Sequence, residues 1–122
     1  MFEYSFEKLE VWRLSKDFVS DLYKITSGFP KEELFGLTSQ IRRAAISIPS
    51  NLAEGSSRQT IKDQSRFTVL SYSSALEVLN HIIIANDLKY ISKQEYYSLR
   101  EKLEKITNML NALSKAQRLK ID

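Results

Sequence analysis

The chain lacks the residues on which several classes of protein depend. Its 122 residues include no cysteine and a single histidine, His81. Without cysteine there is no disulfide framework, no thiolate metal site and no thiol nucleophile. One histidine leaves neither a catalytic triad nor a zinc cluster. The three glycines and two prolines make up about 4% of the residues, against a usual share of about 12%. Because sheet-rich folds need many turns, this scarcity argues against an all-β fold.

Long apolar runs and targeting signals are also missing from the sequence. The longest uninterrupted apolar run is 82–85, whereas a membrane span needs about 20 residues. The first seven residues, Met-Phe-Glu-Tyr-Ser-Phe-Glu, have neither the basic start nor the apolar stretch of a secretory signal. We therefore expect a cytoplasmic protein that has no membrane partner.

The charge is mildly basic. Eighteen Lys and Arg residues against 15 Asp and Glu residues give a net charge of +3. A weak attraction to anions follows, with nucleic acid and membrane headgroups as candidates. Three of the cations, Lys115, Arg118 and Lys120, gather near the C-terminus. They also fit a solvated helix end, where cations stabilise the helix dipole.

Four segments have the apolar spacing of helices, and the length of the chain predicts one domain. The segments cover roughly 7–27, 36–55, 60–89 and 92–116, and short connections favour an all-α, antiparallel up-down four-helix bundle. Gly28 is expected to follow the first helix in the left-handed conformation. Pro49 is expected to kink the second helix or to force a restart capped by Ser47. Thr60 and Ser92 are N-cap signals for the last two helices.

The third segment carries two apolar stripes, although a helix in a small bundle usually buries only one. One stripe contains Val69, Tyr72, Leu76, Leu79 and Ile83, and the other contains Phe67, Ala75, Val78, Ile82 and Ala85. Either this helix lies deep in the bundle or one side of it faces another subunit. Large exposed apolar patches are unusual on a monomer. The second segment adds Ile46, Pro49 and Ala53 away from its core face, so the pattern predicts self-association.

A polar stripe on the second segment is the densest candidate site, with Gln40, Arg43, Ser47, Asn51 and Glu54 recurring every three or four residues before Arg58. It has three interpretations. In the first, the stripe is a structural network or subunit interface, in which Arg43 pairs with Glu54 or Glu77. In the second, it is part of an anion-binding surface that uses Arg42, Arg43, Arg58 and Lys62. In the third, it is a catalytic site that combines Glu54 with Ser57 or Arg58. Since no nucleophile–base pair or phosphate loop is evident, we expect no enzyme, metal or cofactor.

The chain resembles a known family in several segments. They are Phe6-Glu-Lys-Leu-Glu-Val-Trp12, Phe29-Pro30, the stretch from Phe35-Gly36-Leu37 to Ala53-Glu54-Gly55, and Arg58. These resemble the 23S rRNA-intervening sequence proteins over nearly the whole chain. The resemblance implies an antiparallel four-helix bundle and a ring-shaped homo-oligomer with a central channel, most readily a pentamer. A related group, the accessory proteins of diversity-generating retroelements, similarly forms basic pentameric barrels thought to bind nucleic acid and a reverse transcriptase.

Two functional hypotheses follow. The leading one is a non-enzymatic oligomeric bundle that binds RNA or DNA through phosphate contacts. Its candidate contacts are Arg42, Arg43, Arg58, Lys62, Lys115, Arg118 and Lys120. The alternative is a structural scaffold or adaptor for a protein partner, with Gln40, Arg43, Ser47, Asn51 and Glu54 at the subunit interface.

Overall fold

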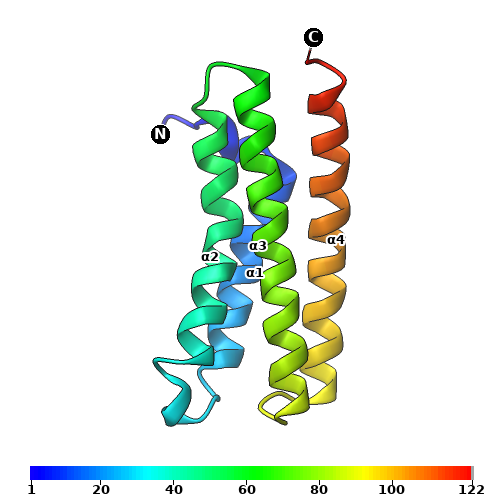
Figure 1. Cartoon of the computed structure of the whole chain (residues 1–122). Helices are drawn as coiled ribbons and strands as arrows, with labels where there is room; N and C mark the ends of the chain where they lie inside the picture. Colours follow the sequence, from blue (N-terminus) through cyan, green and yellow to red (C-terminus); the bar gives the residue numbers. More distant parts are fainter. Residues whose placement is uncertain (122) are drawn as a thin grey trace.

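The structure, a computed structural model, describes residues 1–121, which contain four α-helices and two short 3-10 helices, η1 (Ser5–Lys8) and η2 (Lys31–Glu33). Each helix packs against two neighbours, in the cyclic order α1–α2–α3–α4, while the diagonal pairs make no close backbone contact. Figure 1 shows the helices running alternately up and down, with both termini at the same end of the bundle. All observed bounds lie within three residues of the predicted ones: α1 (Glu10–Thr26), α2 (Leu37–Ser56), α3 (Ile61–Asp87) and α4 (Lys93–Arg118). The predicted all-α four-helix fold is confirmed.

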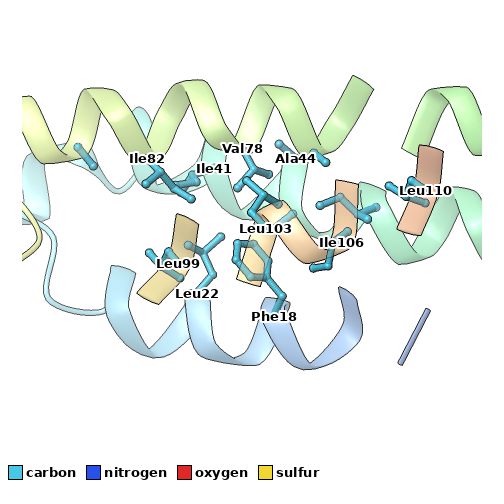
Figure 2. Close-up of a cluster of buried hydrophobic side chains, with 14 of the residues drawn as sticks. Phe18, Leu22, Ile41, Ala44, Val78, Ile82, Leu99, Leu103, Ile106 and Leu110 are labelled. Carbon is cyan, nitrogen blue, oxygen red and sulfur yellow. The ribbon is translucent and has the colours of Figure 1, made fainter. Parts of the chain in front are cut away.

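The core consists of one apolar face from each helix. Residues spaced three or four apart share a helix face, and these faces meet on the bundle axis. Burial of such side chains stabilises the fold by about 25 cal/mol per Å² of apolar surface removed from water. Figure 2 shows the side chains converging from all four helices: Phe18, Leu22, Ile41, Ala44, Val78, Ile82, Leu99, Leu103, Ile106 and Leu110.

The predicted N-caps of α3 and α4 are confirmed. The Thr60 hydroxyl accepts a hydrogen bond of 3.1 Å from the backbone N–H of Asp63. The Ser92 hydroxyl accepts one of 3.0 Å from Glu95 N–H, and the Glu95 carboxylate accepts one of 2.9 Å from Ser92 N–H. These bonds satisfy N–H groups that have no partner within the helix, and they explain where both helices begin.

The prediction for Gly28 is wrong. Helix α1 ends at Thr26, and the Gly28 N–H donates to the Ile25 carbonyl at 3.1 Å. This tight turn needs no left-handed residue, and no glycine of the chain has a positive φ. Within residues 1–121 the one left-handed residue is Lys89, with φ of 62°, in the connection between α3 and α4.

Helix α2 continues through Pro49 without a restart. It is assigned as helix from Leu37 to Ser56, with the half-buried proline ring inside it. Ser47 therefore does not cap a new helix. Proline removes one backbone hydrogen bond, but α2 is held between α1 and α3, and the Ser71 hydroxyl of α3 donates to the Ile48 carbonyl at 2.9 Å.

The two apolar stripes of α3 have different surroundings. The stripe that begins at Phe67 is buried against the other helices. The second stripe stays largely in solvent on a single chain, where Val69 is 50%, Leu76 44% and Ile83 36% exposed, while Tyr72 and Leu79 are half-buried. Helix α3 therefore does not lie deep in the bundle, and one apolar side of it remains uncovered.

Helix α3 is also long and apolar enough, by length and composition alone, to cross a membrane. The sequence argument considered only uninterrupted apolar runs, and uncharged serine and asparagine residues interrupt the runs of α3. It therefore did not identify α3 as a helix that meets the length and hydropathy criteria. A core helix of a soluble protein passes the same test, and 39% of the qualifying window is buried inside the bundle. The finding is weak evidence for a membrane span.

Candidate functional site

Five of the seven predicted phosphate-binding residues lie at the end of the bundle that carries the termini. Helix α2 finishes there, α3 begins there and α4 finishes there (Figure 1). We call these five residues the basic end; Arg42 and Arg43 lie apart from them, because Arg43 stands 13 residues before the end of α2 at Ser56, a distance of about 20 Å along the helix. The basic end comprises Arg58, Lys62, Lys115, Arg118 and Lys120.

A cavity joins the segments of the basic end. It has a volume of about 290 Å³ and is lined by residues of α2, α3 and α4 together with Ser5 and Leu9 of the N-terminal segment. Lys120 lines it together with Asn51, Gln64 and Gln117. The end of α4 therefore lies near the end of α2 and the start of α3, and Lys120 is the one cation of the basic end that lines this cavity.

The cations of the basic end are not equally available. Lys62, Lys115, Arg118 and Lys120 are exposed. Arg58 is half-buried, its Nη2 lies 2.7 Å from Glu54 Oε2, and its guanidinium stacks on the Phe67 ring at 4.7 Å. The spacing of four residues between Glu54 and Arg58 favours this ion pair. Among residues 1–121, no ion pair engages the other four cations.

Acidic residues limit the extent of the positive surface. Residues 54–66 and 115–121 contain six basic and two acidic side chains. Residues 1–10, at the same end, contain three acidic and one basic. Positive charge is therefore concentrated at the α2–α3 connection and the end of α4. The exposed Arg66 belongs to the same positive region and was not predicted. It lies one turn after Lys62 on the same face of α3.

Arg42 is held by contacts within the chain. Its Nε donates to the Thr26 hydroxyl at 2.8 Å, its Nη2 donates to the Tyr23 carbonyl at 3.3 Å, and its guanidinium stacks on the Tyr23 ring at 4.4 Å. A cation beside the last carbonyls of a helix also interacts favourably with the helix dipole. Arg42 thus fastens α2 to the end of α1.

Arg43 is exposed and forms no ion pair among the residues that the structure describes. The predicted pairing of Arg43 with Glu54 or Glu77 is therefore absent within one chain. Glu54 lies 11 residues further along α2, which corresponds to about 16 Å. It pairs instead with Arg58, four residues away.

The middle of the polar stripe is used in the contact between α2 and α3. Ser47 and Ser74 share a hydroxyl–hydroxyl hydrogen bond of 2.9 Å, and the Asn51 amide donates to the Ser47 carbonyl and hydroxyl at 2.9 and 3.0 Å. Helices α2 and α3 also approach closely near the end of α2, so that a Cβ added to Gly55 would lie 2.8 Å from the Phe67 Cβ. Ser47 and Asn51 are half-buried and hydrogen-bonded within the chain, while Gln40, Arg43 and Glu54 are exposed.

A second surface, between α1 and α2, was not predicted. It is a shallow groove of about 590 Å³ beside Phe35, whose side chain is 92% exposed. The available signal was the apolar pair Leu34-Phe35, which lies between two helices and outside their apolar spacing. The groove is lined by Tyr23, Leu34, Phe35, Thr38, Ser39, Arg42, Arg43 and Ile46.

Glu33 fixes the loop that presents Phe35. One carboxylate oxygen accepts a hydrogen bond of 2.9 Å from the Tyr90 hydroxyl, and the other accepts one of 3.2 Å from Leu37 N–H. The hydrogen bond to Glu33 raises the pKa of Tyr90, with smaller contributions from burial and from the charges of Glu33 and Glu32. The two partners are 57 residues apart, so no local pattern could have revealed this contact.

No group of three or more metal-ligating side chains occurs within the described part of the chain. His81 is buried on α3, and its Nδ1 has no hydrogen-bond partner there. Glu54, the residue of the catalytic interpretation, is exposed and paired with Arg58, while the Ser57 hydroxyl donates to the Glu54 carbonyl at 2.7 Å. This geometry does not orient a base toward a nucleophile.

Comparison with known proteins identifies the family. The sequence model of the 23S rRNA-intervening sequence proteins matches residues 7–112, and the chain belongs to this family. A crystal structure of a protein of unknown function from the S23 ribosomal protein family of Bacteroides thetaiotaomicron is similar, with a TM-score of 0.77 and 23% identity. The similarity covers 86% of this chain and 98% of that one, and it supports the fold. No curated protein matches the sequence.

Proposed function

We propose that the chain is a non-enzymatic protein that assembles into a ring-like homo-oligomer and binds RNA through phosphate contacts. The basic end is the observation that carries this proposal, because three separate segments place their cations in one region. A pentamer, as the family resemblance suggests, would carry five times +3, about +15.

The uncovered side of α3 supports self-association. Val69, Leu76 and Ile83 are exposed there. Between Arg66 and Asp87 the helix contains one acidic and no further Lys or Arg side chain. An exposed apolar surface of this kind on a soluble chain is typical of a protein–protein contact.

Phosphate contacts would come from the four free cations of the basic end. Lys62, Lys115, Arg118 and Lys120 have flexible side chains in solvent, which suits contacts to a backbone without base recognition. Each contact releases counterions, so affinity falls as salt rises, with a logarithmic slope of about −0.7 per contact for single strands and about −0.9 for duplexes. Copies in one assembly multiply weak contacts into strong binding.

The test is a titration of labelled ribosomal RNA fragments at several salt concentrations. The variant Lys115→Glu/Arg118→Glu/Lys120→Glu is expected to lose most of the binding and to flatten the salt dependence. Its assembly, measured by light scattering, is expected to stay unchanged because the apolar side of α3 is intact.

A matched control separates local charge from total charge. The triple variant Lys24→Glu/Lys31→Glu/Lys93→Glu alters exposed residues at the opposite end of the bundle (Figure 1). Both triple variants change the charge by three times −2, from +3 to −3. The control is expected to retain most of the binding. Equal losses in the two variants, or no binding by the unmodified chain at low salt, would defeat the proposal.

The scaffold or adaptor remains the second candidate, favoured by the exposed Gln40 and Arg43 on the outer face of α2. In that case the chain assembles and binds a protein partner, but the RNA titration shows no shift. The substitution Arg43→Ala would then break assembly, whereas RNA binding through the basic end predicts no such effect.

A further inference from the structure

The cavity at the basic end combines apolar walls with a lining that is rich in amides. Leucines from three segments line it, and they are Leu9 before α1, Leu52 of α2 and Leu113 of α4. Side-chain amides from three helices line it as well, and they are Asn51 of α2, Gln64 of α3 and Gln117 of α4. None of the residues that line it is acidic. Its volume of about 290 Å³ is close to the lower limit of about 300 Å³ for ligand pockets, so one planar ring system fits it better than a large cofactor.

Two of these amides have an unpaired carbonyl oxygen. The Asn51 Nδ2 donates to the Ser47 carbonyl at 2.9 Å, and the Gln64 Nε2 donates to the Arg58 carbonyl at 3.0 Å. These bonds fix which end of each amide is the donor. Within residues 1–121 neither carbonyl oxygen accepts a hydrogen bond, and neither is buried out of reach of solvent. The cavity therefore offers one acceptor from α2 and one from α3 to the N–H groups of a ligand.

Helix α4 can supply a donor and a positive charge. The Gln117 Oε1 is buried and has no hydrogen-bond partner among residues 1–121. Turning this amide toward the cavity breaks no hydrogen bond of that oxygen and relieves the cost of an unpaired buried acceptor. The exposed Lys120 lies next to it, because the Lys120 N–H donates to the Gln117 carbonyl at 3.0 Å. A ligand that satisfies all these groups has two donors, one acceptor and a nearby negative charge.

Among the RNA bases, guanine has this distribution of groups. Its N1–H and its N2 amino group donate from two neighbouring positions, and its O6 lies beside them as an acceptor. Adenine and cytosine carry their donors on a single nitrogen, and uracil in a nucleotide has one N–H. Base pairing occupies the same edge of guanine, so the amides can read it only in an unpaired base.

The surroundings of the cavity also suit a single strand. Phe2 and Tyr4 precede Ser5, which lines the cavity, and they are 75% and 61% exposed. Exposed aromatic rings beside cations are the features on which unpaired bases stack. The acidic side chains of residues 1–10 repel phosphates, so the backbone of the strand is expected to follow the cations at the end of α4.

We propose that the cavity binds one unpaired guanine of the RNA. The guanine N1–H and N2 amino group donate to the oxygens of Asn51 and Gln64, the Gln117 amide donates to O6, and Lys120 contacts the phosphate of the same nucleotide. This inference rests on the RNA binding proposed above, and it names the kind of strand and the base that the basic end selects.

The test measures the binding of labelled oligouridine strands that contain one guanine, at one low salt concentration. The guanine strand is expected to bind about tenfold more tightly than the all-uridine strand, which leaves an amide oxygen unpaired. Inosine in the same place lacks the N2 amino group and should give an intermediate affinity. Adenine controls for the size of a purine and should bind like uridine. Annealing the guanine strand to its complement is expected to abolish the preference.

The matched variants are Gln117→Leu and Gln94→Leu. Both replace a glutamine of α4 by leucine, but Gln94 is exposed at the opposite end of the helix. Gln117→Leu is expected to lose most of the preference for guanine while it still binds the all-uridine strand through the cations. Gln94→Leu is expected to retain the preference. Circular dichroism checks the fold, and Leu113→Phe, which fills the cavity, repeats the experiment if Gln117→Leu is unfolded.

The outcomes separate this inference from the proposed function. A chain that binds no strand at low salt overturns both. Equal binding of the guanine and all-uridine strands, or a preference that survives in Gln117→Leu and Leu113→Phe, overturns the guanine site alone. Free guanosine monophosphate carries the same base and is expected to compete weakly, because it lacks the neighbouring phosphates. Competition as strong as that of the guanine strand would overturn RNA as the source of the base.

Discussion

The contact between Thr26 and Arg42 gives the sharpest test of how the structure uses its arginines. Thr26 is 2% exposed, and its hydroxyl donates to the Leu22 carbonyl at 2.8 Å and accepts a hydrogen bond of 2.8 Å from Arg42 Nε. The substitution Thr26→Val keeps the shape of the side chain and removes both hydrogen bonds. If Arg42 fastens α2 to α1, the variant loses a charge-assisted bond that contributes about 1.5–3 kcal/mol.

Thr68→Val is the matched control for this prediction. Thr68 is also buried, at 3% exposure, and its hydroxyl donates to the Gln64 carbonyl at 3.2 Å within its own helix. It receives no hydrogen bond from an arginine among the described residues. We expect this substitution to change the free energy of unfolding by less than about 1 kcal/mol, because it removes a single neutral hydrogen bond.

The assay is urea unfolding followed by circular dichroism, at one protein concentration for all chains. With an m-value of about 2 kcal/mol/M, a loss of about 2 kcal/mol lowers the midpoint by about 1 M. Equal midpoints for Thr26→Val and Thr68→Val would refute the structural role of Arg42. In that case Arg42 would again be a candidate for phosphate binding.

Two further predictions concern Tyr90 and Gly55. Because the pKa of Tyr90 is raised, its stabilising contribution is complete below the ordinary tyrosine pKa of about 10. It is lost as pH rises through the higher folded value. Absorbance titration should show one late-ionising tyrosine, and Glu33→Gln should lower the pKa of Tyr90 toward the ordinary range because it removes the charge of the acceptor; an unchanged titration contradicts this. Gly55→Ala places a Cβ 2.8 Å from the Phe67 Cβ, so overpacking of about 1–3 kcal/mol should exceed the helix-propensity gain of about 1 kcal/mol. Gly28→Ala has a nearest contact of 3.5 Å and no positive φ, so thermal unfolding should show it neutral or slightly stabilised, and the reverse ranking contradicts the packing argument.

The helices and their caps could be predicted because their signals are local. Apolar spacing depends on residues three or four positions apart, and a cap such as Ser92 with Glu95 lies within one turn. The Glu54–Arg58 pair was predictable for the same reason. The error at Gly28 shows the limit of this reasoning, because several turns can end a helix and a glycine does not select one of them.

The candidate site could be predicted only in part. Sequence reasoning identified the cations, but it could not show that Arg42 is held by Thr26, 16 residues away. The hydrogen bond between Tyr90 and Glu33 joins residues 57 positions apart, and no local sequence pattern predicts it. Phe35 was missed because the periodicity argument applies to helices, and this residue lies between them.

From the order of its residues alone, this chain was committed to four amphipathic helices and to more apolar surface than one bundle covers. Those properties depend on neighbours within a few positions along the backbone. Packing of the helices then selected which stripe of α3 stayed in solvent, which cations formed contacts within the chain, and which reached the basic end. Such outcomes depend on distances between residues far apart in the sequence, and those distances exist only once the helices lie side by side.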